Sequence, residues 1–201
     1  SLQAAPGSGP RHGAFWNPSS VVSEDGTTFF YLVAELSSTV TGYAVRYLPY
    51  HGGLRFMKVT ESTTYGPLDL PEGNAPAEVQ VTPDNRFLII SNRNNTSFSL
   101  PTSTNGTLEP SDSLSTFALQ TDGTLAFHQL WPSGGRYPRH FSTNAAGDLV
   151  AVANQYSQDV VVLRRDTATG LIGEPVARAT VGGNTTCVVF DEQEAFSGLG
   201  A

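Results

Sequence analysis

The sequence has few of the groups that hold metals or form disulfides. Its 201 residues include one cysteine, Cys187, so neither an intrachain disulfide nor a thiolate metal cluster is possible within them. The four histidines form no HxH or HExxH pattern, and we therefore expect no metal site.

Basic charge and long apolar runs are also scarce. Charged residues make up 14% of the chain, the formal net charge is −7 and no basic cluster stands out, which argues against a nucleic-acid partner. No stretch approaches the roughly 18 consecutive apolar residues of a membrane span, so we expect no membrane partner.

Turn residues and short apolar runs dominate what remains. The chain has 20 glycines, 13 prolines and an apolar fraction of 39%, which is enough for a packed core. Runs of β-branched and aromatic residues are cut by turn residues, and no segment has the pattern of a long amphipathic helix. The sequence therefore predicts an all-β fold.

The sequence repeats itself along its length. Three copies begin with Pro10-Arg11-His12, Pro76-Ala77-Glu78 and Pro138-Arg139-His140, at intervals of 66 and 62 residues. The third copy predicts four strands, at 140–143, 149–153, 160–163 and 175–180. Four antiparallel strands per repeat indicate a blade of a β-propeller. A solenoid is the alternative, although solenoid repeats are usually shorter than about 50 residues.

The repeat predicts the boundaries of the blades. We expect blades at 8–66, 75–132 and 137–181, followed by the first strand of a further blade at 185–190. Two polar stretches, 60–74 and 94–113, are predicted to be inserted loops. About three blades and one strand make only a partial ring, because propellers have at least about four blades. We therefore expect the native protein to be longer and to supply the remaining blades from its full-length chain.

Polar residues recur in two positions of each predicted blade. One position opens the first strand and the other closes the second strand. Because these strands are antiparallel, both positions lie at one end of the sheet, and the first strand of a blade lines the propeller channel. We therefore expect their side chains to meet at one mouth of the channel. They are Arg11, His12, Glu78, Arg139 and His140 in the first position, and Glu35, Asn92, Arg93, Asn154 and Gln155 in the second.

These residue types suit acid–base chemistry on an anion. Guanidinium groups match carboxylate or phosphate oxygens, and a carboxyl group beside two imidazoles can carry a proton near neutral pH. The alternative is that the arginines and histidines only bond loop carbonyls around the channel. Cys187 occupies the first position of the next blade, and we interpret it as a packing residue. Trp16 and Trp131 are predicted to lie in the core.

The motifs together resemble a known family. They are Gly9-Pro10-Arg11-His12, Ala34-Glu35-Leu36-Ser37-Ser38-Thr39-Val40, Ala77-Glu78-Val79 with Ser91-Asn92-Arg93, and Pro138-Arg139-His140-Phe141 with Ala153-Asn154-Gln155. In this order they resemble the middle blades of the lactonase family of seven-bladed propellers, over about residues 7–190. That family includes bacterial-type 6-phosphogluconolactonases and fungal 3-carboxy-cis,cis-muconate lactonizing enzymes.

The resemblance implies a lactone-forming or lactone-opening enzyme, either an isomerase or a hydrolase. It implies catalytic roles for His12, Glu78 and Arg139, and substrate binding by the other polar residues of the two positions. The expected substrate is a small carboxylated or phosphorylated molecule, and no cofactor is implied.

A non-catalytic protein is the competing hypothesis. Ala34 stands where many relatives have asparagine, and the two inserted stretches are absent from compact bacterial members. Four glycosylation sequons begin at Asn94, Asn95, Asn105 and Asn184. These features suggest a fungal glycoprotein, secreted or in the cell wall rather than cytoplasmic, that serves as a binding module.

Overall fold

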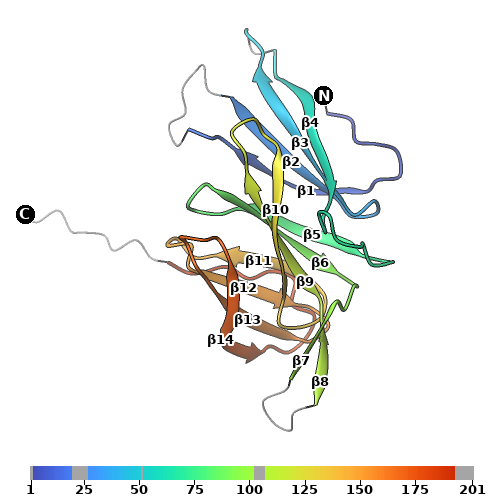
Figure 1. The fold of residues 1–201 in the computed structure, drawn as a ribbon, viewed down its shortest axis with the longest axis vertical. Helices are drawn as coiled ribbons and strands as arrows, with labels where there is room; N and C mark the ends of the chain where they lie inside the picture. The colour runs from blue at the N-terminus through green and yellow to red at the C-terminus, as the bar shows by residue number, and fades with distance from the viewer. Residues whose placement is uncertain (1, 20–26, 51, 102–106, 193–201) are drawn as a thin grey trace, which may run out of the picture.

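The computed structural model describes residues 2–19, 27–50, 52–101 and 107–192, and this part of the chain consists of strands and turns without a helix. Twelve of its strands form three four-stranded antiparallel sheets, which confirms the predicted all-β, blade-like architecture (Figure 1). Within the described residues, no helix of the length and hydropathy needed to cross a membrane is present.

The first and third sheets are each formed by four consecutive strands, whereas a separate two-stranded hairpin interrupts the second sheet between its second and third strands in sequence. The first contains β1 (Pro10–Trp16), β2 (Thr28–Ala34), β3 (Thr39–Tyr47) and β4 (Leu54–Thr63). The second contains β5 (Ala75–Val81), β6 (Phe87–Arg93), β9 (Ser113–Leu119) and β10 (Leu125–Pro132). The third contains β11 (Pro138–Thr143), β12 (Leu149–Asn154), β13 (Asp159–Arg165) and β14 (Ile172–Thr180).

The sheets pack face to face, and the core lies between them. Between the first and second sheets lie Trp16, Phe29, Tyr31, Val33, Val40, Val79, Leu88, Ile90 and Phe117. Between the second and third lie Ile89, Leu114, Phe141, Val150, Val152, Val161, Leu163 and Ile172, with Trp131 packed against them. Both tryptophans therefore belong to the core, as predicted. Burial of each such side chain contributes about 1.5–3 kcal/mol.

A glycine turn tightens each sheet-to-sheet contact. Gly123 and Gly170 lie between the last two strands of the second and third sheets, with φ of 86° and 83°. A side-chain carbon at Gly123 would lie 2.1 Å from the ring of Phe29, and one at Gly170 would lie 2.3 Å from that of Phe87. Glycine is therefore required here both for the backbone conformation and for the approach of the preceding sheet.

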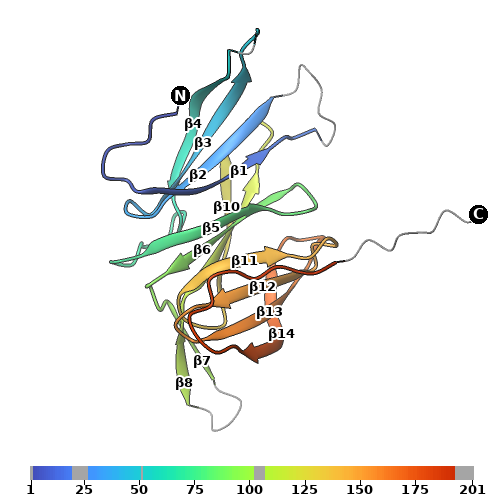
Figure 2. The same cartoon turned by 180° about the vertical axis from the view of Figure 1, so that it is seen from behind.

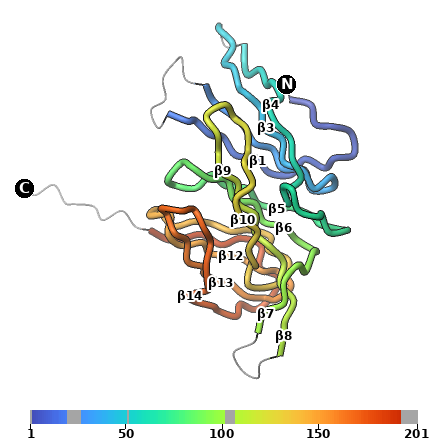
Figure 3. The backbone as a smooth tube through the Cα atoms, in the orientation of Figure 1, coloured from blue at the N-terminus to red at the C-terminus, as the bar shows by residue number. Residues whose placement is uncertain are grey.

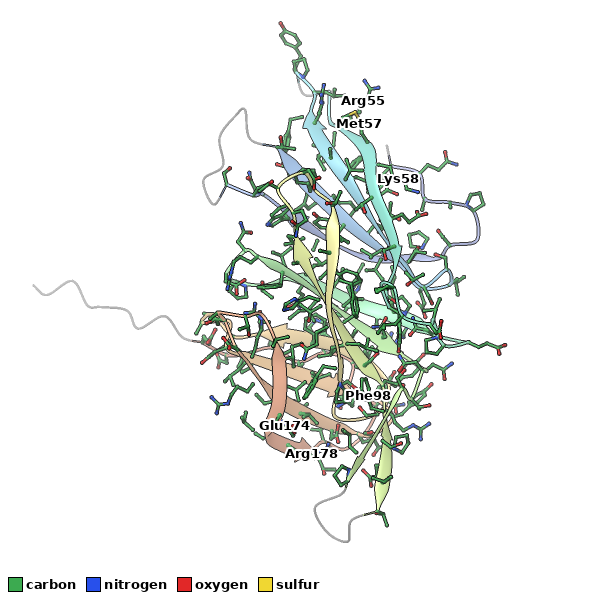
Figure 4. The ribbon with its side chains drawn as sticks, viewed as in Figure 1. Arg55, Met57, Lys58, Phe98, Glu174 and Arg178 are labelled. Carbon is green, nitrogen blue, oxygen red and sulfur yellow. The ribbon has the colours of Figure 1, made fainter. Side chains whose placement is uncertain are left out.

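Face-to-face packing brings the first strands together. β5 contacts β1 on one side and β11 on the other (Figure 2). Gln80 on β5 donates a hydrogen bond to the carbonyl of Phe141 on β11 at 2.8 Å. The fourth strands lie away from this line: Figure 4 shows Met57 and Lys58 on β4 and Glu174 and Arg178 on β14. The first strands are thus the inner strands of the assembly.

Three sequence expectations need correction. The stretch 94–113 is not a simple loop, because it carries a hairpin of β7 (Phe98–Pro101) and β8 (Leu108–Ser111), which pairs backbone groups that a loop would leave to solvent (Figure 3). The stretch 60–74 begins as strand, since β4 runs to Thr63 against β3. Residues 185–190 form no strand, because no neighbouring strand pairs with them in the described structure.

A buried ion pair joins the second and third sheets. The guanidinium of Arg165, whose side chain is 0% exposed, donates to Asp84 Oδ2 at 2.7 Å and to the carbonyl of Gly147 at 2.8 Å. Burial alone would raise the pKa of Asp84, but hydrogen bonds from Thr82 and Arg165, together with the Arg165 charge, hold that pKa below its usual value. The lowered pKa makes this contact stabilising above about pH 4.

We predict that Asp84→Ala destabilises the protein by about 3–5 kcal/mol, because it leaves the buried Arg165 charge without its partner. Lys58→Ala is the control, since Lys58 and Glu61 form an ion pair at 2.9 Å between half-exposed side chains, worth about 1 kcal/mol or less. Denaturant unfolding of the natural protein measures both. The difference between wild type and Asp84→Ala should shrink as pH falls through the lowered pKa of Asp84. Equal effects of the two substitutions would contradict the prediction.

Candidate active site on the inner strands

Each inner strand has a bulge directly after its proline. The register with the second strand shifts between Pro10 and His12 in β1, between Pro76 and Val79 in β5, and between Pro138 and His140 in β11. A bulge inserts an extra residue and redirects the side chains beside it, and bulges are common next to active sites. The bulges fall on the first of the two predicted polar positions in all three sheets.

Glu78 lies between two histidines from the neighbouring sheets. Its Oε2 is 2.8 Å from His12 Nδ1 and 3.6 Å from His140 Nε2. The Glu78 side chain is 10% exposed, whereas that of His12 is 45% exposed. Ser91 Oγ accepts the backbone N–H of Glu78 at 3.0 Å, which fixes the bulge that carries it. A buried carboxylate therefore faces an imidazole that solvent can reach.

A second carboxylate, Glu35, holds two arginines at the same end of the sheets. Arg93 donates to Glu35 Oε1 at 2.5 Å, and Arg11 Nε lies 3.4 Å from Glu35 Oε2. Burial and the nearby positive charge of Arg93 lower the pKa of Arg11, while Glu35 partly offsets them. Arg139 and Glu78 also act on the charge of Arg11, so both groups of side chains share one electrostatic environment.

Arg11 retains an unused donor. Its Nη1 atom is buried and has no hydrogen-bond partner among the described residues. Buried polar atoms are nearly always paired in folded proteins, so an unpaired guanidinium N–H marks a place for a ligand oxygen or a water molecule. With Arg93 and Arg139 nearby, this place favours an anion.

Seven of the predicted site residues thus meet at one end of the inner strands. They are Arg11, His12, Glu35, Glu78, Arg93, Arg139 and His140. No group of three or more histidine, cysteine, aspartate or glutamate side chains among the described residues is placed to hold a metal ion.

Three predicted residues do not join this cluster. Asn92 is fully buried and donates to Ser115 Oγ at 3.2 Å, inside the second sheet. Asn154 is also fully buried, and donates to the carbonyl of Ser133 and to Asp159 Oδ1 within the third sheet. Gln155 contributes a main-chain bond to the carbonyl of Tyr137. Successive residues of a strand point to opposite faces, so neighbours such as Asn92 and Arg93 cannot turn the same way.

The structure also places residues at the site that the sequence did not predict. The ring of Tyr137 lies under the Arg93 guanidinium, 4.8 Å from ring centroid to Cζ, and stacks on Tyr156 at 4.0 Å. A signal was present, because Tyr137 precedes Pro138 as Gly9 precedes Pro10. Cys187 is exposed rather than packed, and its Sγ lies 4.0 Å from His140 Nε2.

The family is shown by a match over most of the chain. The sequence profile of the family described as "Lactonase, 7-bladed beta-propeller" matches residues 1–190. The chain belongs to the lactonase family of seven-bladed β-propellers. The resemblance to this family is therefore confirmed, and the three four-stranded sheets are consistent with blades of a partial propeller.

Relatives within the lactonase family carry related names. The 6-phosphogluconolactonase of Formosa agariphila is 28% identical over 94% of this chain and 45% of its own length. That of Bacillus subtilis is 29% identical over 83% of this chain and 40% of its own. The solved structure of the Pseudomonas aeruginosa periplasmic gluconolactonase superposes with a TM-score of 0.67 at 26% identity, over 92% of this chain and 43% of that one. The chain thus spans less than half the length of these lactonases.

We predict that Glu35→Gln lowers stability by about 1–3 kcal/mol, because Arg93, with a side chain only 2% exposed, loses its charged partner. Glu174→Gln on the exposed surface of β14 is the control and should change stability by less than about 0.5 kcal/mol. Thermal or denaturant melting of the natural protein with each substitution measures the difference. A Glu35→Gln protein as stable as wild type would show that the Arg11–Glu35–Arg93 contact contributes nothing to stability.

Proposed function

We propose that this chain supplies part of the active site of a lactonase that hydrolyses a phosphorylated sugar lactone of the 6-phosphogluconolactone class. One observation carries the proposal: a buried carboxylate, Glu78, contacts two imidazoles beside three guanidinium groups. That combination provides a proton acceptor, a proton donor and an anion-binding surface in one place. The names of the family relatives favour hydrolysis as the reaction.

The arginines provide the anchor for the substrate. Arg11, Arg93 and Arg139 carry three positive charges, and Glu35 neutralises one of them directly. The buried, unpaired Nη1 of Arg11 offers a strong donor to a phosphate or carboxylate oxygen. A bound anion would thus satisfy the donor and reduce the repulsion among the guanidinium groups.

We assign the activation of water to Glu78. In the proposed step, the Glu78 carboxylate removes a proton from a water molecule whose oxygen attacks the lactone carbonyl carbon. The carbonyl oxygen gains negative charge, which the Arg139 guanidinium stabilises. The ring C–O bond then breaks, and the leaving oxygen takes a proton from His12, 2.8 Å from Glu78. The products are the open hydroxy acid and an enzyme in which Glu78 returns its proton to His12.

The second candidate function is that of a fungal-type lactonizing enzyme, which closes a lactone ring instead of opening it. The same arginines would hold the carboxylates of a 3-carboxymuconate, and Glu78 or His12 would move the proton during ring closure. The cluster of arginines supports this candidate, because the geometry of a guanidinium group fits a carboxylate as well as a phosphate.

The non-catalytic hypothesis rests on the sequons. Asn94 is exposed and directly follows β6, so its side chain is accessible to solvent. Asn105 falls outside the described residues. Under the non-catalytic hypothesis the protein is a secreted or cell-wall glycoprotein, and its arginine, histidine and glutamate cluster binds an anion without turnover.

We predict that Glu78→Gln lowers kcat on 6-phosphogluconolactone by roughly 100-fold or more, with a smaller change in KM, because glutamine keeps the shape but cannot accept a proton. Steady-state kinetics of the full natural protein and of its Glu78→Gln variant measures kcat and KM, with 3-carboxymuconate and muconolactone tested as parallel substrates. Unchanged turnover would remove Glu78 from the mechanism, and turnover of 3-carboxymuconate alone would favour the lactonizing reaction.

We predict that Arg139→Lys weakens substrate binding by roughly 10- to 100-fold, a difference of about 1–3 kcal/mol. Lysine keeps the charge but loses the two parallel N–H donors of the guanidinium group. The measured quantity is kcat/KM for the phosphorylated lactone. Arg136→Lys is the control, since Arg136 is exposed and lies three residues away on the same segment. Equal kinetics for the two variants would exclude Arg139 from substrate contact.

A further inference from the structure

Tyr137 has a backbone conformation that its side chain disfavours. Its φ is 65°, in the left-handed region, and it directly precedes Pro138. Residues with a bulky side chain rarely adopt this region, and a following proline further restricts the backbone conformation of the residue before it. At the equivalent place in the first blade, Gly9 has the same φ of 65°, without that penalty.

Asp112, from the inserted segment of the second blade, holds this conformation. Its carboxylate accepts the backbone N–H of Tyr137 at 2.6 Å, and also those of Asn95 and Thr96 at 2.9 and 2.7 Å. The Tyr137 carbonyl accepts the N–H of Gln155 at 2.9 Å. Asp112 is 1% exposed, so these bonds are shielded from solvent. The insertion is therefore tied to the residue that begins the third blade.

The ring of Tyr137 lies between a cation and a second ring. The Arg93 guanidinium is 4.8 Å from its centroid, and Tyr156 stacks at 4.0 Å with an interplanar angle of 21°. The Tyr137 ring therefore contacts both the Arg93 guanidinium and the Tyr156 ring. Arg93 in turn binds Glu35, which contacts Arg11, the residue with the unpaired donor. Tyr137 is thus the first member of a chain of contacts that ends at the anion site.

We propose that Tyr137 is a positioning residue for the anion site: its ring fixes Arg93, and through Glu35 fixes Arg11, at the cost of backbone strain that Asp112 helps to hold. The inference rests on the proposed function for the identity of the anion. A glycine would satisfy this backbone without strain, as Gly9 does, so the ring itself is what tyrosine adds. Strained residues that persist in a fold tend to lie at functional sites.

The test uses the full natural protein with Tyr137→Gly, Tyr137→Leu and Tyr137→Phe. Phenylalanine keeps the ring face and should behave as wild type. Leucine and glycine remove the aromatic face and should weaken 6-phosphogluconate binding, measured by calorimetry, by roughly 10-fold, because Arg93 and Arg11 must then be ordered when the ligand binds. The KM for the phosphorylated lactone should rise by a similar factor, with kcat within about twofold, because the lost interaction serves binding alone.

Tyr50→Gly is the matched control. Tyr50 also has a left-handed φ, of 56°, but its side chain is 98% exposed and lies on the turn between β3 and β4. Both glycine variants remove strain, so neither should lose binding through the backbone alone. Only the Tyr137 variant should lose affinity. Wild-type binding in Tyr137→Leu and Tyr137→Gly overturns the inference, as does equal weakening in Tyr137→Phe.

The failures of the two proposals are distinguishable. A wild-type protein that binds 6-phosphogluconate but turns over no lactone contradicts the proposed function, while the three Tyr137 variants still decide the inference through binding. A wild-type protein that binds no 6-phosphogluconate contradicts both. Turnover with unchanged KM in Tyr137→Leu contradicts the inference and leaves the lactonase proposal standing.

Discussion

The face-to-face packing of the sheets is the constraint on which the site depends. No single blade contains the cluster: His12 comes from the first, Glu78 from the second and Arg139 and His140 from the third. Their side chains meet only because the apolar faces of adjacent sheets bury residues such as Phe29 and Phe117, and Ile89 and Phe141, against each other. Glycine turns let the sheets approach closely enough for the inner strands to touch. The core therefore sets the distances between the polar side chains of the cluster.

Within that frame, two local devices orient the polar side chains. A bulge after the proline of each inner strand turns the polar pair out of the regular alternation of the sheet. Contacts between blades then fix the turned side chains, as Glu35 does by joining Arg11 of its own blade to Arg93 of the next. The result is a site that combines one buried proton acceptor with an excess of positive charge.

Much of this could be predicted from the sequence because it repeats. The recurring proline and the two residues after it predicted where each inner strand begins. Antiparallel pairing then predicted that Glu35 and Arg93 lie at the same end as Arg11 and Glu78. The sequence did not resolve which side chain of two adjacent residues faces the cluster, because a shift of one residue along a strand exchanges the two faces of the sheet. Asn92 and Asn154 were therefore expected in the cluster, although both are buried within their own sheets. The hairpin of β7 and β8 escaped prediction because each of its strands has only four residues and contains a proline.

The role of Tyr137 could not be predicted from residue type. Its left-handed backbone depends on Asp112, 25 residues earlier in the chain, and no local pattern indicates such a contact. Cys187 was interpreted as a packing residue because free cysteines are usually buried, yet here it lies exposed beside His140. Both cases depend on contacts between blades, which local sequence patterns do not encode.

The most direct test of the central claim is the crystal structure of the full natural protein with 6-phosphogluconate, the product of the proposed reaction. The account predicts that the phosphate group lies within hydrogen-bond distance of Arg11 Nη1, and that the carboxylate lies beside the Arg139 guanidinium with its carbon facing Glu78 and His12. A ligand bound at another face of the blades, with the Arg11 donor still unpaired, would contradict it.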